Sequence, residues 1–464
     1  MNKVLLISSP LYFSDGMPQS LDVSAPPLGL IFLGSYIKKY SDKFDVEILD
    51  VSLEKMSLSE IGKKIEKEKY FAIGMSGMTP QLQGVVELAR KIKSVDREVK
   101  IFLGGPHISA DPDFINRYSD VFDYALTGEA ERTLLDSLNK LLEGVEIPRL
   151  QRGEALEDLD DLSSDSLGMI DRDKYRATET MFYSRGCPFQ CYFCSRPSIE
   201  RHVRYRSVDH VLTEIKKNLN RSKGRIDFQD DTFTMRRDKI VDFCRAVIQE
   251  KLKLNWTCNT RIDLVDEKLL ELMSLAGCSM INFGIESGSE RVRQEVVNKG
   301  KFSNEQIKLV FSWCKRNRIK VACYFMIGHP TETREELNRT KQMILDLPID
   351  ILGLSIPTPF PGSKLYQIAE EEGIISKKII DDFAEKKLGL GYAGVYPIYV
   401  SSNMTREYVL NEMAEINKRF YLRPKVLISR FMEDVSSFSR LRVGFVNLLN
   451  ILKSGIPTRK PYKK

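Results

Sequence analysis

The most informative stretch of the sequence is Gly186-Cys187-Pro188-Phe189-Gln190-Cys191-Tyr192-Phe193-Cys194, which places three cysteines on one loop after the strand-like segment Glu179–Tyr183. Three thiolates on one loop can hold three irons of a cubane iron–sulfur cluster and leave the fourth iron open to a ligand. Zinc is the alternative metal, because it prefers four ligands and His202 offers a fourth. The spacing alone leaves both kinds of site open.

The other five cysteines form no metal-ligand pattern. They are scattered through apolar segments, at Cys244, Cys258, Cys278, Cys314 and Cys323. The N-terminal stretch Met1–Pro10 is too short and too soon broken to be a secretory signal. We therefore expect these five cysteines to be reduced, buried thiols that behave as small apolar side chains.

A second pattern, the alternation of strand-like and helix-like segments, continues from the cysteine loop toward the C-terminus. The predicted strands are Glu179–Tyr183, Arg225–Gln229, Asn255–Thr260, Met280–Ile285, Lys320–Ile327 and Ile351–Ile356. The predicted helices include Val208–Leu219, Arg237–Glu250, Asp266–Ala276, Asn304–Arg316 and Arg334–Leu345. Six strands joined by right-handed helical crossovers indicate a barrel or partial barrel over residues 179–375, with its chemistry at the carboxyl ends of the strands.

Residues 1–147 alternate in the same way and predict a separate parallel sheet covered by helices. Its predicted strands are Val4–Ser8, Val46–Asp50, Phe71–Ser76, Lys100–Gly104 and Tyr124–Thr127, and its predicted helices are Leu28–Tyr40, Ser59–Glu68, Thr79–Val95 and Ala130–Leu142. Four loops at the carboxyl edge are rich in small residues: 24–29, 76–80, 104–107 and 128–131. Tight turns explain any one of them, whereas four at one edge favour a large ligand that approaches the backbone.

The remaining segments complete the domain organisation. Residues 148–178 have little periodicity and predict a linker, and residues 376–464 predict a helical, basic C-terminal region. The whole chain has 464 residues, 42% apolar and 29% charged, which excludes disordered, collagen-like and disulfide-stapled classes. The net charge of +6 is unevenly distributed along the chain. Residues 415–464 carry 12 basic and 3 acidic residues (+9), which leaves −3 for residues 1–414.

The cysteine loop and the strand ends that follow it resemble the radical S-adenosylmethionine (SAM) superfamily. The resemblance rests on Cys-x3-Cys-x-Phe-Cys together with the segments 228–233, 256–263, 282–289, 325–333 and 357–363, in barrel order. It implies a [4Fe–4S] cluster on Cys187, Cys191 and Cys194. The SAM-binding residues that it implies are Phe193, Asp230, Asp231, Arg261, Glu286, Ser287, Ile327 and Gly328.

The implied SAM contacts suit the chemistry of these residues. Asp230 and Asp231 offer carboxylates to the amino group of SAM, and Arg261 offers a planar fork to its carboxylate. The resemblance gives Glu286 the ribose hydroxyls and the backbone near Ile327 the adenine. The alternatives are that Asp231 and Glu286 cap strand-to-helix turns and that Phe193 is a core residue.

Residues 1–147 resemble the cobalamin-binding domain of cobalamin-dependent radical SAM enzymes, a class that includes the class B methyltransferases. The implied cobalamin-binding residues are Pro27, Leu28, Gly29, Ser76, Thr79, Gly104, Gly105, His107, Gly128 and Glu129. Two features depart from the patterns of cobalamin domains. The Asp-x-His-x-x-Gly element that supplies a lower histidine ligand is absent, and Ala130 replaces the second glycine of Gly-Glu-Gly-Glu. A ligand-free Rossmann-like module is the alternative.

The resemblance implies an enzyme that uses a [4Fe–4S] cluster to cleave SAM to a 5′-deoxyadenosyl radical. The expected reaction is methylation of an unactivated carbon, or phosphorus, of a small-molecule or lipid substrate, with cobalamin as the methyl carrier. The alternatives are a rearrangement, cyclisation or C–C bond formation without methyl transfer, and a non-enzymatic metal- or iron–sulfur-binding protein. No residue is assigned to catalysis on the substrate. We expect an anoxic cytoplasmic location and an electron donor such as flavodoxin or ferredoxin.

The basic C-terminal tail gives one indication of where the protein binds in the cell. Leu441, Phe445, Leu448, Leu449 and Leu452 fall on one face of a predicted helix, 438–452. Basic amphipathic helices lie on anionic membrane surfaces, which predicts a peripheral membrane contact. The alternative is that this face packs on the barrel. Nucleic acid is disfavoured as a partner, because the tail lacks interleaved aromatic residues.

Overall fold

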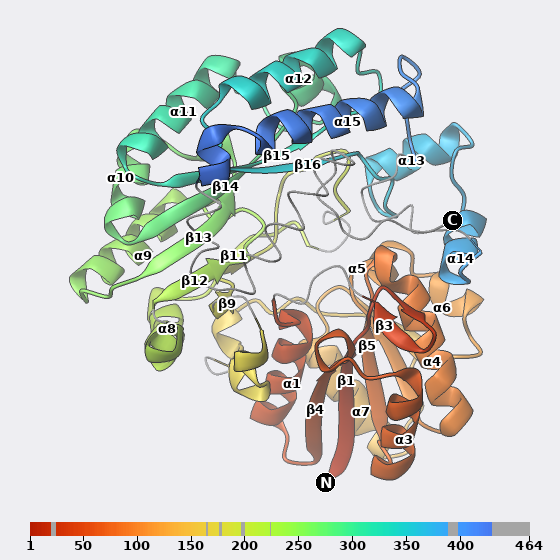
Figure 1. Ribbon diagram of the computed structural model, residues 1–464. Helices are drawn as coiled ribbons and strands as arrows, with labels where there is room; N and C mark the ends of the chain where they lie inside the picture. Colours follow the sequence, from red (N-terminus) through yellow and green to blue (C-terminus); the bar gives the residue numbers. More distant parts are fainter. Residues whose placement is uncertain are drawn as a thin grey trace.

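The computed structural model describes residues 1–19, 25–163, 166–175, 179–195, 200–222, 224–387 and 398–428. It contains two parallel α/β sheets, each in its own domain, as the sequence predicts. Figure 1 shows the N-terminal sheet with the carboxyl ends of its strands directed toward the second domain. The loops that carry the predicted site residues therefore lie between the two domains.

The N-terminal sheet has six parallel strands in the order β4-β1-β5-β6-β7-β8. They are β1 (Asn2–Ser8), β4 (Phe44–Asp50), β5 (Ala72–Ser76), β6 (Lys100–Gly104), β7 (Tyr124–Thr127) and β8 (Leu150–Arg152). The chain leaves β1 on one side to form β4 and returns on the other to form β5, so the strand order reverses beside β1. Ligands of such sheets bind at this switch point. β8 comes from the predicted linker, which is therefore shorter than expected.

Helices cover both faces of this sheet because successive side chains of each strand point to opposite faces. Leu5 and Ile7 share a core with the helices α3 and α4, whereas Val4 and Leu6 face α1 and α7. The main helices are α1 (Leu28–Tyr40), α3 (Leu58–Glu68), α4 (Leu82–Val95) and α7 (Glu131–Leu142). The short elements are β2 (Tyr12–Ser14), β3 (Met17–Gln19), α2 (Val51–Glu54), η1 (Thr79–Gln81), α5 (Pro106–Ala110) and α6 (Phe114–Arg117).

The second domain is a partial barrel of six parallel strands in chain order. The strands are β9 (Glu179–Met181), β12 (Arg225–Phe228), β13 (Asn255–Thr260), β14 (Cys278–Glu286), β15 (Lys320–Met326) and β16 (Ile351–Ser355). The helices outside them are α8 (Val208–Ser222), α9 (Arg237–Gln249), α10 (Glu267–Leu275), α11 (Asn304–Arg316) and α12 (Arg334–Asp346). The five scattered cysteines lie buried in this domain's core, which confirms the prediction of structural thiols.

The segments after the barrel do not form a separate unit in the described residues. The helices α13 (Lys364–Glu371) and α14 (Lys377–Ala384) pack into the core of the N-terminal domain, where Ile380 and Phe383 are buried. α15 (Arg406–Tyr421) instead lies along the barrel, and the Tyr421 hydroxyl donates to the Leu352 carbonyl at 2.7 Å. Figure 1 shows α14 beside the N-terminal domain and α15 across the barrel. The predicted helix 438–452 lies outside the described residues.

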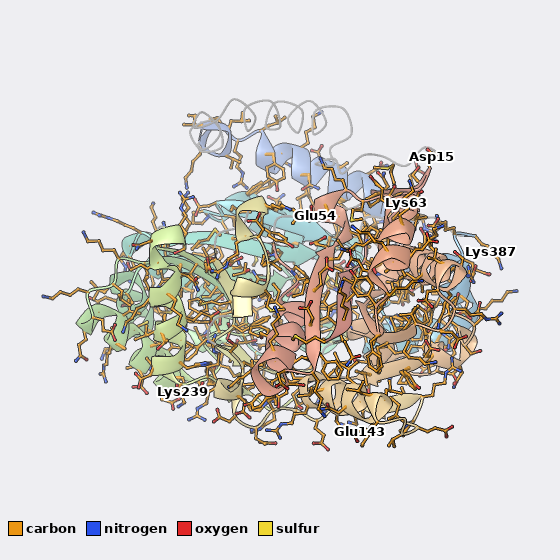
Figure 2. All side chains as sticks on the ribbon, turned by 90° about the horizontal axis from the view of Figure 1, so that it is seen from below. Asp15, Glu54, Lys63, Glu143, Lys239 and Lys387 are labelled. Atoms are coloured by element: carbon orange, nitrogen blue, oxygen red, sulfur yellow. The ribbon has the colours of Figure 1, made fainter. Side chains whose placement is uncertain are left out.

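Charged side chains cover the outer surface of both domains. Figure 2 shows Asp15, Glu54, Lys63, Glu143 and Lys387 at the periphery, and all five are exposed. Within the described part of the chain, no helix has both the length and the apolar character needed to cross a bilayer.

Candidate active site at the junction of the two domains

A cavity of about 450 Å³ lies at the switch point of the N-terminal sheet and extends to the barrel domain. Its floor includes Ser8 and Ser76, at the ends of the two strands between which the order reverses. Its opposite wall includes Gly186, Glu200 and Asp231 of the barrel domain. The cavity therefore extends from the predicted cobalamin loops to Gly186 and Glu200, which lie on either side of the three cysteines in the sequence.

Most of the predicted cobalamin-binding residues line this cavity. They are Pro27, Leu28, Gly29, Ser76, Gly104, Gly105, Gly128 and Glu129. Gly105 has a φ of +98°, and a Cβ atom there would lie 2.7 Å from the Ser76 hydroxyl oxygen. Only glycine fits that position without strain, and it lets a ligand approach the backbone closely. Ala130 also lines the cavity, so the replacement of the family's glycine leaves the wall small.

Two of the predicted cobalamin-binding residues, Thr79 and His107, are absent from the cavity lining. The Thr79 hydroxyl lies 3.0 Å from Nδ1 of His107, and both side chains are buried. The His107 ring also meets the Phe114 ring edge-on, and burial lowers the pKa of His107 to about 4. His107 is thus a neutral core histidine in this structure, held by Thr79 behind the loop that lines the cavity.

The cysteine loop lies between two short antiparallel strands that pair with each other, β10 (Ser184–Arg185) and β11 (Arg204–Tyr205). Gly186 has a φ of +99° and packs against the His202 carbonyl, so no side chain fits there. The amides of Cys187 and Cys194 donate to the carbonyls of Glu200 and Cys191, at 3.4 and 3.0 Å. All three cysteines of the loop are partly exposed, in contrast to the five buried thiols of the barrel core.

Tyr192 anchors the middle of this loop. Its amide donates to the Val297 carbonyl at 3.1 Å, and its carbonyl accepts from the Leu365 amide at 2.9 Å. Its hydroxyl lies 2.8 Å from Nδ1 of His329, whose Nε2 lies 3.3 Å from the Glu286 carbonyl. Tyr192 is 5% exposed. The residue between two cysteines thus ties the loop to β14, β15 and α13.

Two cations face the loop near Cys191. Lys299 is buried, and its ammonium lies 2.8 Å from the Glu286 carboxylate. Arg261 forms a two-pronged ion pair with Asp263, at 2.9 and 2.7 Å, while its guanidinium covers the Phe189 ring at 3.7 Å. Burial raises the pKa of the Cys191 thiol, and Lys299 and Arg261 act in the opposite direction. The pair of cations therefore favours a thiolate on this loop.

The predicted SAM residues Asp230 and Asp231 point to different surroundings. Asp230 is fully buried and accepts hydrogen bonds from the amides of Tyr183 and Ser184, at 3.0 and 2.5 Å. Burial raises the pKa of Asp230 to about 6 against the effect of these hydrogen bonds. Asp231 lines the cavity. In this structure Asp230 holds the strand end that leads into the cysteine loop, whereas Asp231 faces the ligand space.

The remaining predicted SAM residues lie on the loops after β14 and β15 and on the cysteine loop. The hydroxyls of Ser287 and Thr340 lie 3.1 Å apart, so Ser287 faces α12. The Ile327 amide donates to the Ser355 carbonyl at 3.1 Å, and the Gly328 amide donates to the Glu332 carboxylate at 2.7 Å. Phe193 is partly buried against the apolar core that contains Tyr192.

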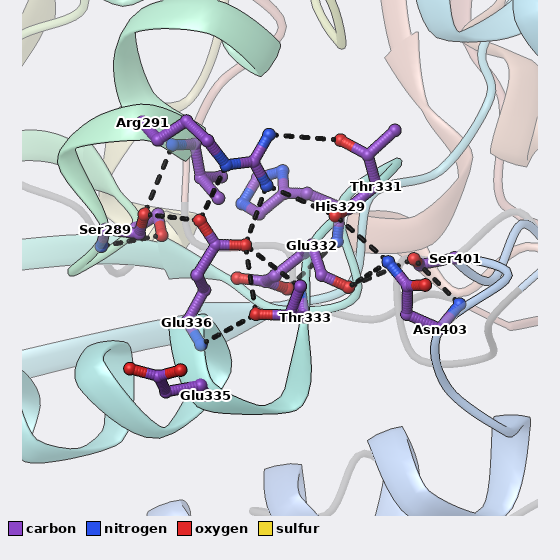
Figure 3. Close-up of polar contacts among 12 residues, drawn as sticks. Ser289, Arg291, His329, Thr331, Glu332, Thr333, Glu335, Glu336, Ser401 and Asn403 are labelled. Atoms are coloured by element: carbon purple, nitrogen blue, oxygen red, sulfur yellow. Dashed lines mark hydrogen bonds and ion pairs between the residues drawn. The ribbon is translucent and has the colours of Figure 1, made fainter.

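A polar network fixes the loop after β15, as Figure 3 shows. Glu336 accepts from the Arg291 guanidinium, at 2.8 and 2.7 Å, and from the Ser289 hydroxyl, at 3.0 Å. The side chain of Glu332 lies under the same loop and is almost fully buried, which raises its pKa to about 8. Hydrogen bonds and an ion pair therefore connect the loop after β14 to the start of α12, which follows the loop after β15.

Comparison with known proteins matches both domains to described families. Residues 181–344 match the model of the radical SAM superfamily, and residues 19–137 match the B12 binding domain. An uncharacterized methyltransferase of Pyrococcus horikoshii is 30% identical over 453 residues, which cover 93% of this chain and 95% of that protein. The chain belongs to the cobalamin-binding radical SAM enzymes.

Two further relatives of this radical SAM enzyme are informative. The anaerobic magnesium-protoporphyrin IX monomethyl ester cyclase of Rubrivivax gelatinosus is 26% identical, over 93% of this chain and 79% of that protein. The radical SAM methyltransferase TsrM from Kitasatospora setae, solved with cobalamin and a [4Fe–4S] cluster, shares the fold with a TM-score of 0.65. It is 16% identical and covers 80% of this chain and 75% of its own.

The residues present fit the cofactors of this radical SAM enzyme: a [4Fe–4S] cluster, SAM and cobalamin. Cys187, Cys191 and Cys194 supply a thiolate donor set. Among the described residues, no three Cys, His, Asp or Glu side chains lie close enough together to hold one metal ion. A cubane cluster does not need one, because each thiolate binds a different iron. The cavity has a glycine-lined wall at the switch point of the N-terminal sheet, which is the kind of surface that lets a large ligand approach the backbone.

Three residues that shape the site escaped the predictions from sequence. The sequence places Tyr192 only within the cysteine motif and assigns no role to Lys299 or Arg185. Arg185 directly precedes Gly186-Cys187, and Lys299 stands in Asn298-Lys299-Gly300 after the fourth barrel strand. Their positions beside recognised motifs were the available signal, because their partners are distant in sequence.

Proposed function

We propose that this enzyme transfers a methyl group from SAM to an unactivated carbon, or phosphorus, of a small-molecule or lipid substrate held between its two domains. The observation that supports this most is the single cavity bordered both by the cobalamin loops and by Gly186, next to Cys187. When bound, the cluster supplies the electron that cleaves SAM, and cobalamin carries the methyl group. The protein positions both and excludes water.

The SAM contacts are proposed as follows. Asp231 receives the SAM amino group, since it lines the cavity. Glu286 and Arg261 lie on either side of the loop near Cys191, where both are buried and already paired, with Lys299 and Asp263. These pairs hold the carboxylate and the guanidinium in fixed positions, from which we propose that they contact the ribose and the carboxylate of SAM. Asp230 acts through Ser184, as a positioning residue.

The second candidate is a radical rearrangement or cyclisation without methyl transfer. The 26% identical cyclase, matched over most of this chain, favours it. The same cavity and the same cofactors suit both reactions, so they differ in whether the methyl group of SAM enters the product.

Labelled SAM distinguishes the two reactions. The reconstituted enzyme is incubated anaerobically with methyl-deuterated SAM, a reductant and metabolite or lipid extracts, and the products are analysed by mass spectrometry. Methyl transfer predicts a compound heavier by one labelled methyl group. An unlabelled product formed together with 5′-deoxyadenosine would contradict methyl transfer and support the second candidate. The Cys191→Ala variant is the control for both.

Two accessory interactions belong to the same proposal. A flavodoxin- or ferredoxin-type protein supplies the electron, because iron–sulfur clusters are reduced one electron at a time by low-potential donors. The basic segment 436–464 contacts anionic membranes. Flotation with anionic liposomes, using the full chain and a chain that ends at residue 435, tests the second point. Equal flotation of the two chains would remove the membrane contact from the proposal.

A further inference from the structure

Four charged side chains form a compact cluster at the boundary between the cobalamin domain and the barrel. Arg185 contacts Glu129 at 3.3 Å and Glu131 at 2.8 Å, and Arg204 forms a short ion pair with Glu129. Each of the four side chains is at most 15% exposed. Two guanidinium groups face two carboxylates, so the cluster is neutral overall. We call it the interdomain clamp.

The position of the clamp links the two cofactor sites. Arg185 and Arg204 pair directly across the β10–β11 hairpin and so hold both ends of the segment that carries the three cysteines. Glu129 lies on the loop after β7 and Glu131 is the first residue of α7, and both line the same cavity as Arg185. The clamp is therefore one direct polar contact between the wall of the cavity and the ends of the cysteine-bearing segment.

The geometry of the clamp is specific. An arginine fork bridging two carboxylates fixes direction as well as distance, which a lysine cannot do. The Arg185 guanidinium also lies 5.1 Å from the centre of the Phe32 ring, and Phe32 lines the same cavity. Although burial opposes its charge, Glu129 keeps a lowered pKa because Arg204 and Arg185 contact it. The carboxylate is thus held in its charged form.

Both carboxylate oxygens of Glu129 already accept hydrogen bonds from the protein. Both of its oxygens accept from Arg204, and one of them also accepts from the Leu156 amide at 3.3 Å. Glu129, which the sequence predicts to bind cobalamin, therefore lines the cavity while its carboxylate contacts the arginines of the barrel domain.

We propose that the interdomain clamp is a positioning device: Arg185 and Arg204, held by Glu129 and Glu131, set the cysteine loop relative to the cobalamin cavity and couple occupancy of one site to the other. Such coupling is reciprocal, so the cluster changes the affinity for cobalamin by the same factor as cobalamin changes that for the cluster. The inference rests on the family's cofactors and does not depend on which reaction follows.

The test measures hydroxocobalamin binding by absorbance in cluster-free and cluster-reconstituted protein. The wild-type protein should show a ratio of the two Kd values of about fivefold or more. Arg185→Gln should bring this ratio close to one while it still binds the cluster. In the reduced protein, hydroxocobalamin should alter the cluster's EPR spectrum for the wild type and leave that of Arg185→Gln unchanged. Arg185→Lys, which keeps the charge and loses the fork, should give an intermediate ratio.

Arg117 provides a matched control. It also bridges carboxylates, Asp111 at 2.6 Å, Asp381 at 2.9 Å and Asp113 at 3.3 Å, and lies 5.4 Å from the centre of a phenylalanine ring. It bridges the N-terminal domain to α14 and does not line the cavity. Arg117→Gln should therefore keep the wild-type ratio. If Arg185→Gln fails to fold by circular dichroism, Arg185→Lys and Glu131→Gln take its place.

Two results would overturn the clamp's role. One is a wild-type ratio of one in protein that binds both cofactors, and the other is a variant of Arg185 that keeps the full ratio and the EPR change. Failure of the wild-type protein to bind hydroxocobalamin or iron at all would instead contradict the cofactor assignment, and with it the proposed function.

Discussion

Lys299 is one of the two buried cations that face the cysteine loop, and it also pairs with Glu286. Such a charge stabilises thiolates, so its removal should raise the pKa of Cys191. In metal-free protein, Lys299→Gln should slow iodoacetamide alkylation of Cys191 at pH 8 by at least about threefold, because one pKa unit changes the thiolate fraction about tenfold. Peptide mass spectrometry follows the rate at that cysteine.

The exposed neighbour Lys301 is the control for this prediction. Lys301→Gln should leave the alkylation rate unchanged, because solvent screens its charge. An unchanged rate in Lys299→Gln as well would show that this cation does not act on the loop.

At the residue scale the sequence predicted the groups that lie within recognisable motifs. The three cysteines and most of the cavity-lining residues follow from local patterns at strand ends, because the carboxyl ends of parallel strands meet at one edge. Lys299 and Arg185 could not be predicted in this way, since their roles come from partners that only the tertiary fold brings near. His107 shows the converse: a motif histidine that turns into the core.

At the scale of structural elements, a side-chain contact anchors the cysteine loop: the Tyr192 hydroxyl lies 2.8 Å from Nδ1 of His329. Tyr192→Phe leaves Nδ1 of a buried histidine without this partner, which costs about 1–3 kcal/mol of unfolding free energy. Urea denaturation of the metal-free protein should show this loss, and the reconstituted variant should release iron faster to a chelator.

Tyr40→Phe serves as the control for the loop, because the Tyr40 hydroxyl lies at the surface and contacts Asp161 at 3.3 Å. It should change neither stability nor iron release. Wild-type stability in Tyr192→Phe would mean that the hydroxyl does not anchor the loop.

The loop after β15 should respond to pH through Glu332. Its pKa of about 8 in the fold exceeds that of an unfolded glutamate, so the fold binds a proton that the unfolded chain has lost. Stability from this group is therefore present at low pH and is lost as pH rises through 8. Between pH 6.5 and 8 the loss amounts to between about 1 and 2 kcal/mol.

Glu332→Gln should remove this loss, because its amide cannot ionise. Urea denaturation of both proteins at pH 6.5 and 8 measures the difference, and the comparison cancels titrations that the two proteins share. Parallel pH profiles of the two proteins would contradict a protonated Glu332.

The elements themselves were largely predictable, because strands and helices here have strong periodicity and clear caps. α1, β6, β7, β13 and α11 have the predicted bounds. β8 was missed because Leu150–Arg152 is too short to carry a pattern, and its side chains are mostly exposed. Its pairing with β7 follows from the fold alone.

On the scale of the whole molecule, α14 ties the end of the barrel to the N-terminal domain. Phe383 is 1% exposed in that domain's core, and its carbonyl accepts from the Gln83 side chain at 2.9 Å. Phe383→Ala should therefore destabilise the protein by about 3–5 kcal/mol, as for other buried aromatic side chains. The urea midpoint of the metal-free protein measures the effect.

Leu275→Ala is the comparison for α14, since Leu275 is 71% exposed on the barrel. It should change stability by less than about 0.5 kcal/mol. A similarly small effect of Phe383→Ala would mean that α14 does not contribute to the joint between the domains. The sequence predicted a helical region here, but not the surface on which α14 packs, because Gln83 is 300 residues away from Phe383 along the chain.

The central claim is that one chain holds both an iron–sulfur cluster on Cys187, Cys191 and Cys194 and a cobalamin in the facing cavity, and cleaves SAM. Its most direct test is anaerobic reconstitution with iron, sulfide and hydroxocobalamin, followed by reduction and measurement of 5′-deoxyadenosine formed from SAM. We predict that the wild-type protein binds iron and cobalamin and forms 5′-deoxyadenosine, whereas Cys191→Ala forms none and Cys244→Ala retains the activity. Iron binding without cobalamin binding or SAM cleavage in the wild type, or full cleavage by Cys191→Ala, would contradict the account.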